Sequence, residues 1–183
     1  ASGNTDEDQS VVVALSASDI DGDALSFTLG EDASHGSVSI DGSFASFSPE
    51  ADFNGTDSFS FTVSDGELSA TAEITLTINP VNDAPVLAVV SDVGFDEDIS
   101  GSITLSATDV DGDTVSFSIS NGADITAVVD GNEVSFSAPE NFNGSETFTL
   151  SVSDGELADS QTITVTVNPV NDAPELSTVG NRA

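Results

Sequence analysis

Closely spaced carboxylates are the residues of this chain best suited to chemistry. Asp19-Ile20-Asp21-Gly22-Asp23 and Asp109-Val110-Asp111-Gly112-Asp113 each carry three, and Asp6-Glu7-Asp8 and Asp96-Glu97-Asp98 add three more apiece. Hard cations prefer oxygen ligands, and Ca²⁺ takes about six to eight of them. So much local negative charge is costly unless a cation or water relieves it. The clusters therefore predict Ca²⁺ sites, with solvated acidic loops as the alternative; the later Glu and flanking helices of an EF-hand are missing.

The composition excludes most other chemistry. The 183 residues include 33 Asp plus Glu, one Arg and no Lys, which gives a net charge of -32, and there is no Cys and one His. Disulfides, thiol nucleophiles, Schiff bases and His-based metal clusters are therefore excluded within one chain. Nucleic acid needs Lys and Arg, and no apolar run is long enough to insert into a membrane. We expect no enzyme activity, and we interpret His35 as a surface turn residue.

An internal repeat predicts two domains. The acidic clusters recur at an offset of 90, and three later blocks recur at 89, so one residue is lost from a loop between them. The boundary falls at Asn79–Pro85, where two prolines prevent a central strand from continuing. We predict a first repeat over residues 1–82 with its first strand truncated, a second over 83–172, and a tail or the start of a next repeat over 173–183. Pro85–Val90 is the predicted first strand of the second repeat.

The local pattern is that of β-strands with one buried face and one solvent-exposed face. Apolar residues alternate with Ser and Thr, and Asp-Gly and Asn-Gly steps punctuate the runs. About seven short strands in roughly 90 residues fit a Greek-key β-sandwich of immunoglobulin-like size, and no helix is expected. The same alternation predicts core packing, rather than a sugar-stacking platform, for Phe44, Phe47, Phe53, Phe59 and Phe61.

Three segments resemble a known family. The runs Ser48–Phe59, Val63–Gly66 and Asn79–Pro85 are similar to those of bacterial cadherin-like tandem repeats, found in large surface adhesins of the RTX type. The resemblance covers nearly the whole chain. It implies an all-β fold of two tandem cadherin- or immunoglobulin-like sandwiches joined end to end, with neighbouring repeats of the same polypeptide as partners.

The resemblance also implies Ca²⁺ between successive domains. Two departures, Asn79 at the first linker position and an unmatched motif around Glu50, reduce the expectation to one or two ions. The implied junction ligands are Glu7, Glu50, Asn82, Asp83, Asp109, Asp111 and Asp154. Half-sites toward a preceding domain would use Asp19, Asp21 and Asp65, and those toward a following domain would use Glu97, Glu140, Asn171 and Asp172.

The expected function is that of a Ca²⁺-stiffened spacer in an adhesin on the bacterial cell surface. Two alternatives stay open. A carbohydrate-binding module is one, although sugar sites usually present Trp or Tyr and this chain has neither. Ca²⁺-dependent homophilic adhesion between facing repeats is the other.

Overall fold

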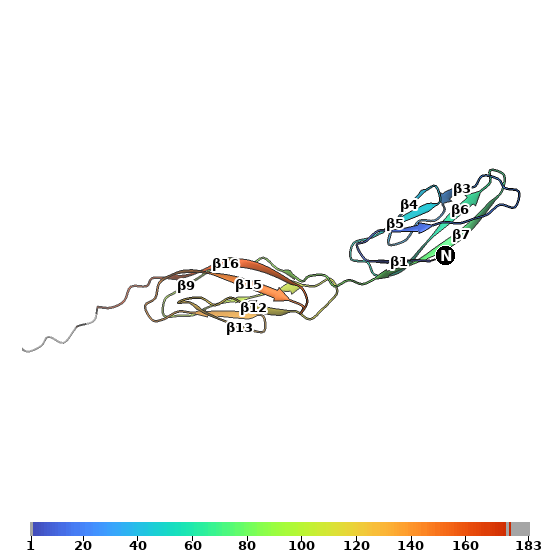
Figure 1. Cartoon of the computed structure of the whole chain (residues 1–183). Coiled ribbons are helices and arrows are strands. Elements are labelled where there is room, and N and C mark those ends of the chain that lie inside the picture. Colours follow the sequence, from blue (N-terminus) through green and yellow to red (C-terminus); the bar gives the residue numbers. More distant parts are fainter. Residues whose placement is uncertain (1, 175, 177–183) are drawn as a thin grey trace, which may run out of the picture. The chain divides into compact units, whose positions relative to one another are not determined.

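The computed structural model describes residues 2–174 and 176, and every regular element among them is a β-strand. Contacts divide the chain into unit 1, Ala1–Asn82, and unit 2, Asp83–Ala183. Figure 1 labels strands of both units, with unit 1 in blue to green and unit 2 in yellow-green to red. The all-β prediction is confirmed.

Unit 1 is built from two sheets. The first has the strand order β1-β7-β6-β3, with β1 and β7 parallel and the other pairs antiparallel, and the second is the antiparallel sheet β2-β5-β4. The strands are β1 (Ser2–Asp6), β2 (Val11–Ala14), β3 (Ser26–Leu29), β4 (Gly36–Asp41), β5 (Phe44–Pro49), β6 (Gly55–Ser64) and β7 (Ser69–Asn79).

The core of unit 1 lies between its two sheets. Phe47 of one sheet and Phe59 and Ile74 of the other are almost completely buried in a single cluster. Each stands in an alternating run, so its neighbours in the strand face solvent. The core prediction is wrong for Phe44, which is 55% exposed. Phe44 and Phe47 are an odd number of residues apart in β5, and such residues point to opposite faces of a strand.

Unit 2 repeats this architecture with an additional strand pair. Its sheets have the orders β12-β15-β16-β9 and β10-β14-β13, and β8 pairs with β11. The predicted first strand, Pro85–Val90, is present in the shorter form β8. The strands are β8 (Val86–Leu87), β9 (Val93–Asp96), β10 (Gly101–Thr104), β11 (Ala107–Thr108), β12 (Ser116–Ile119), β13 (Thr126–Asp130), β14 (Glu133–Ser137), β15 (Gly144–Ser153) and β16 (Ala158–Asn168).

The lost residue of the repeat falls in the loop before β4 and β13. In unit 1 this loop is held by Asp57, whose carboxylate accepts the backbone N–H groups of Ser34 and His35. The shorter loop of unit 2 is held by Glu146, which accepts those of Ala123 and Asp124. The longer carboxylate side chain thus accompanies the shorter loop.

Candidate metal centre

The long strand of each unit separates two acidic ends. β7 has 11 residues, so its ends lie about 33 Å apart at roughly 3.3 Å per residue. Asp65 lies in the turn that precedes β7, and the N–H of Glu7 donates to the carbonyl of Asn79, the last residue of β7. In unit 2, Asp154 lies in the turn that precedes β16, and the N–H of Glu97 donates to the carbonyl of Asn168, the last residue of β16. Each unit therefore carries carboxylates at both ends.

Glu7 is a buried carboxylate at the C-terminal end of unit 1. It is 3% exposed; its Oε1 accepts the N–H of Val81, and its Oε2 accepts from Asn54 Nδ2 at 3.3 Å. Glu97 is 5% exposed and accepts the N–H of Val170 in the same way. The linker backbone is thus bound to a carboxylate in both units.

The Asp109 cluster occupies the other end of unit 2. One oxygen from each of Asp109, Asp111 and Asp113 lies within 4.8 Å of the others. Asp109 Oδ1 accepts the N–H groups of Asp111 and Asp113 at 3.0 and 3.1 Å, which folds the loop back around this carboxylate. Asp109 Oδ2 is buried and accepts no hydrogen bond within the part of the chain that the structure describes. Asp111 Oδ2 accepts the N–H of Asp83 at 2.8 Å.

The corresponding end of unit 1 has the same loop geometry. Asp19 Oδ1 accepts the N–H groups of Asp21, Gly22 and Asp23. Asp65 accepts those of Glu67 and Leu68 at 2.7 Å, as Asp154 accepts those of Glu156 and Leu157. The hydrogen bonds from Leu68 and Glu67 lower the pKa of Asp65 below its ordinary value, so this side chain is anionic at neutral pH.

Most predicted carboxylate ligands, Asp65, Glu97 and Asp154 among them, belong to no acidic group of three within the part of the chain that the structure describes. Glu50 lies beside His35, with 3.5 Å between Oε2 and Nδ1, and neither Glu50 nor Glu140 belongs to an acidic group among the described residues. The residue of that segment that reaches Glu7 is Asn54. Its Asn-Gly step favours a turn, and no sequence signal marks Asn54 as a partner of Glu7. His35, expected in a surface turn, is half exposed and stacks on Phe53 with ring centroids 4.1 Å apart.

Two further carboxylates lie at the Glu7 end, Asp8 of the predicted Asp6-Glu7-Asp8 cluster and Asp52, which no sequence pattern marks as a ligand. Asp8 Oδ1 accepts the N–H of Asp52 at 3.2 Å, and both residues have a positive φ. In unit 2, Asp98 and Asn141 form the equivalent pair. Asp8 adjoins Glu7 in the sequence, but only the fold shows that Asp52 lies at the same end.

The predicted linker ligands stand at the ends of the units. Asn82 is the last residue of unit 1, and Asp83 is the first of unit 2. Asn171 donates from Nδ2 to the carbonyl of Asp172 at 3.1 Å. The predicted tail, 173–183, lies largely outside the described residues.

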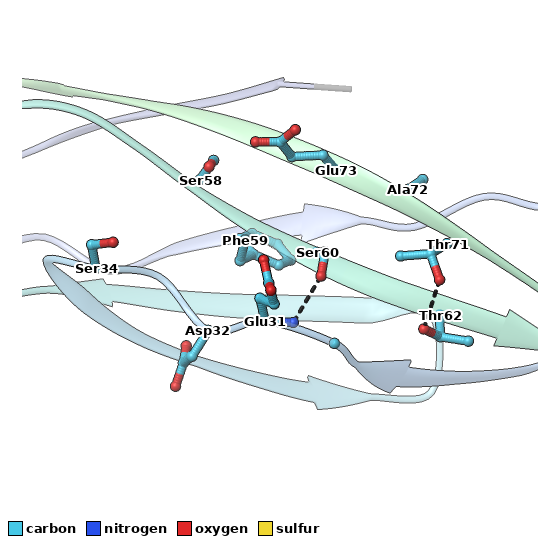
Figure 2. Close-up of a pocket in the computed structure, with 11 residues that line it drawn as sticks. Glu31, Asp32, Ser34, Ser58, Phe59, Ser60, Thr62, Thr71, Ala72 and Glu73 are labelled. Carbon is cyan, nitrogen blue, oxygen red and sulfur yellow. Dashed lines mark hydrogen bonds between the residues drawn. The ribbon is translucent and has the colours of Figure 1, made fainter.

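Unit 1 also has a pocket, here named the hydroxyl-lined pocket for its five Ser and Thr residues, although Glu31, Asp32 and Glu73 line it as well. It has a volume of about 620 Å³ over β6 and β7. Figure 2 shows Ser60 accepting the N–H of Glu31, and Thr62 bonded to Thr71 across the two strands. Phe59 lines the pocket but is 2% exposed, so it offers no ring face for a sugar to stack on.

The comparison with known families identifies the repeat. The model of the bacterial Ig domain matches residues 1–78 and again 82–168. The chain belongs to the bacterial Ig domain family. The two matches cover nearly all of the described residues and confirm the expected tandem sandwich repeat.

Individual relatives agree with this assignment. Chitinase A of Pseudoalteromonas piscicida is 32% identical over 167 residues, which are 90% of this chain and 20% of that protein. Drosophila N-cadherin EC1-4 is similar in structure with a TM-score of 0.59 and 19% identity, over 92% of this chain and 47% of that one. Human protocadherin-24 EC1-2 gives 0.58 and 17%, over 88% of each chain. These cadherins share the fold. Among the described residues there is no helix that could span a membrane.

Proposed function

We propose that this bacterial Ig domain chain is a Ca²⁺-binding spacer of a surface protein, in which ions at the linker between successive units stiffen the array. The observation that carries the proposal is Asp109. Its Oδ2 is buried without a hydrogen-bond donor among the described residues, while its Oδ1 accepts two backbone N–H groups. A buried anionic oxygen without a donor is costly, and a cation relieves that cost.

The donor set fits Ca²⁺. All the side chains concerned offer oxygen and none offers sulfur, since the chain has no Cys. Hard oxygen ligands select Ca²⁺ or Mg²⁺, and Mg²⁺ usually keeps several waters rather than an all-protein shell. Asp109, Asp111 and Asp113 would hold the ion in unit 2.

Chain connectivity supports a shared role for Glu7 and Asp111. Glu7 accepts the N–H of Val81 within unit 1, and Asp111 accepts that of Asp83 within unit 2. Each unit thus has a carboxylate that accepts a backbone N–H from a residue next to Asn82 in the sequence. An ion that used both would neutralise like charges and favour one interdomain orientation, and its removal would loosen the joint by repulsion.

Thermal unfolding with and without Ca²⁺ tests the proposal. At a hundredfold excess over Kd, one bound ion stabilises the folded state by about 2.7 kcal/mol. For a unit of this size that corresponds to a Tm increase of roughly 10–20 °C. Circular dichroism is the suitable probe, because the chain has no Trp or Tyr. Small-angle scattering of the same samples should show a narrower distribution of distances with Ca²⁺ than with EDTA.

Charge-matched variants separate a site from general screening. Asp109→Asn and Asp111→Asn should abolish most of the Ca²⁺-dependent increase in Tm. Asp130→Asn, which removes one exposed charge from a hairpin in the same unit, should leave it unchanged. Equal responses of all three variants, or an equal effect of NaCl at matched ionic strength, would show that no site exists.

A second candidate is attachment to polysaccharide. The observation that favours it is the relative named as a chitinase, which this chain matches over a fifth of that protein's length. The hydroxyl-lined pocket around Ser60 and Thr62 is the surface that a glycan would use. Retention on insoluble chitin, lost in Ser60→Ala/Thr62→Val, would support it; equal retention of this variant, or no retention of the wild type, would refute it.

A further inference from the structure

Two neighbouring pockets of unit 1 are continuous and form one groove over β6. The hydroxyl-lined pocket shares three lining residues with a second pocket of about 400 Å³, namely Ser34, Ser58 and Glu73. The lining follows β6 from Thr56 in the second pocket to Thr62 in the first, a length of about 20 Å at roughly 3.3 Å per residue. A groove of this length suits an extended polymer chain rather than one small molecule.

Ser60 lies within this groove with an acidic residue on each side. β6 runs between β7 and β3, and its register places Ser60 opposite Glu73 of β7. On the other side, the N–H of Ser60 donates to the carbonyl of Glu31, in the loop that follows β3. Figure 2 shows Glu73, Ser60 and Glu31 together. Both acidic residues are exposed, so a carboxylate stands on each side of the row of hydroxyl groups.

The hydroxyl groups of the groove can pair with those of a sugar. Ser60 Oγ accepts the N–H of Glu31 at 2.7 Å and keeps its own hydrogen for a ligand, since a hydroxyl is both donor and acceptor. Thr62 and Thr71 share one hydrogen bond at 3.1 Å, which leaves one of their two hydroxyl hydrogens for a ligand. The groove thus offers donors and acceptors in alternation, as the hydroxyl groups of a sugar chain require.

Two carboxylates distinguish this groove from the equivalent surface of unit 2. Asn121 stands at the position of Glu31, and Thr162 stands at the position of Glu73, at offsets of 90 and 89. The sandwich fold therefore requires an acid at neither position. Within the part of the chain that the structure describes, the one ion pair involves His35 and a different acid, so the protein itself neutralises neither carboxylate.

We propose that the groove of unit 1 binds an extended polysaccharide whose sugars carry free ammonium groups, with Glu31 and Glu73 accepting hydrogen bonds from those groups. The inference rests on the second candidate function above and adds the charge of the glycan. Ammonium groups match the two carboxylates and the net charge of -32, whereas sulfated or uronic acid polymers are repelled. Each exposed ion pair is weak, so affinity comes from repeated contacts along one chain.

Calorimetric titration of the whole chain with a glucosamine hexamer tests the proposal. Metal-free buffer at about 0.15 M salt makes the result independent of the proposed Ca²⁺ sites and screens distant charges. At about pH 6 the Glu side chains are ionised and the sugar amines are largely protonated. Glu31→Gln/Glu73→Gln should bind roughly tenfold more weakly than the wild type, because two ion pairs are lost. The matched control, Asp130→Asn/Glu133→Gln, removes two exposed charges from a hairpin of unit 2 and should bind as the wild type does.

Four outcomes would overturn the proposal, and they can be told apart. Equal weakening of both variants would show that the hexamer is held by net charge alone. A lysine hexamer that binds as tightly, with the same dependence on Glu31 and Glu73, would show that the groove recognises ammonium groups without sugar rings. An N-acetylglucosamine hexamer that binds as tightly as the glucosamine hexamer would leave the second candidate function standing and refute the requirement for free amines. Binding of neither sugar hexamer would refute both.

Discussion

At the scale of single residues, the most informative side chain outside the acidic ends is Asp57. It is 7% exposed and accepts backbone N–H groups from Ser34, His35 and Ser58 at 2.8–3.0 Å. Burial alone raises the pKa of Asp57, but these hydrogen bonds and the charge of His35 outweigh burial and lower the pKa below its ordinary value. The carboxylate thus fixes the loop before β4 in its ionised form.

Asp57→Asn should destabilise unit 1 by about 1–3 kcal/mol, because an amide has one acceptor oxygen where the carboxylate has two. The lowered pKa means that the contribution is fully present above the unfolded-state pKa and is lost as the pH falls through the folded-state pKa. The stability difference between wild type and variant should therefore be large at pH 7 and shrink below about pH 4. Denaturation curves across this range measure it. Asp41→Asn, an exposed charge at the end of β4, is the matched control, and an equal loss of stability in that variant would contradict the argument.

At the scale of elements, the acidic side chain that holds the loop before β4 or β13 is longer where the loop is shorter. Glu146 of β15 reaches the N–H groups of Ala123 and Asp124 at 2.9 and 2.7 Å, across a loop one residue shorter than that of unit 1. The additional methylene of Glu over Asp supplies reach toward the shorter loop. The pairing explains why equivalent positions of the two repeats carry different acids.

Glu146→Asp should release this loop and destabilise unit 2 by about 1–3 kcal/mol, because two hydrogen bonds from backbone N–H groups to a charged carboxylate are lost. Hydrogen exchange should show faster exchange of the amides of Ala123 and Asp124, with the loop of unit 1 unaffected. Insertion of one residue between Ser120 and Ala123, which gives the loop the length found in unit 1, should restore protection in the Asp variant. If the insertion slows the exchange of neither amide in the Glu146→Asp variant, the length of the loop and the length of the acidic side chain are independent.

At the scale of the whole molecule, the main feature is the large negative charge. A net charge of -32 over 183 residues, with Arg182 as the one basic residue besides the weakly basic His35, means that self-repulsion opposes the compact state. The apolar alternation that builds two separate cores overcomes it. Cations screen such repulsion, so we expect the stability of both units to rise with ionic strength.

Monovalent salt should raise the Tm even without divalent ions. Between low salt and about 0.5 M NaCl in EDTA, screening of the repulsion should add on the order of 1 kcal/mol, or about 4–8 °C for a unit of this size. Calorimetry in NaCl and in tetramethylammonium chloride measures it, since both salts screen equally and only sodium is small enough to bind at carboxylates. A Tm that does not change with either salt would show that the acidic surface is too dispersed to oppose folding.

The acidic residues show how far the sequence predicts the candidate site. Asp109 and Asp111 could be singled out because a two-residue spacing on a turn brings carboxylates together locally. The Asp6-Glu7-Asp8 run marks the region, but only the resemblance picks Glu7 within it. Its burial against the linker depends on Asn79 and Val81, more than 70 residues away. Glu50 as a ligand stays a prediction of the resemblance, and its carboxylate lies beside His35.

The sequence by itself determined the class of fold and the number of units, and it limited the side chains of any metal site mainly to oxygen donors. Alternating apolar residues, a repeat of about 90 residues and the absence of Cys and Lys are local or compositional properties, and they need no knowledge of distant contacts. Only the tertiary structure decided which carboxylates are buried and which faces of β5 carry Phe44 and Phe47. Those features depend on register and on pairing between residues far apart in the chain, and a shift of one residue in a strand reverses them.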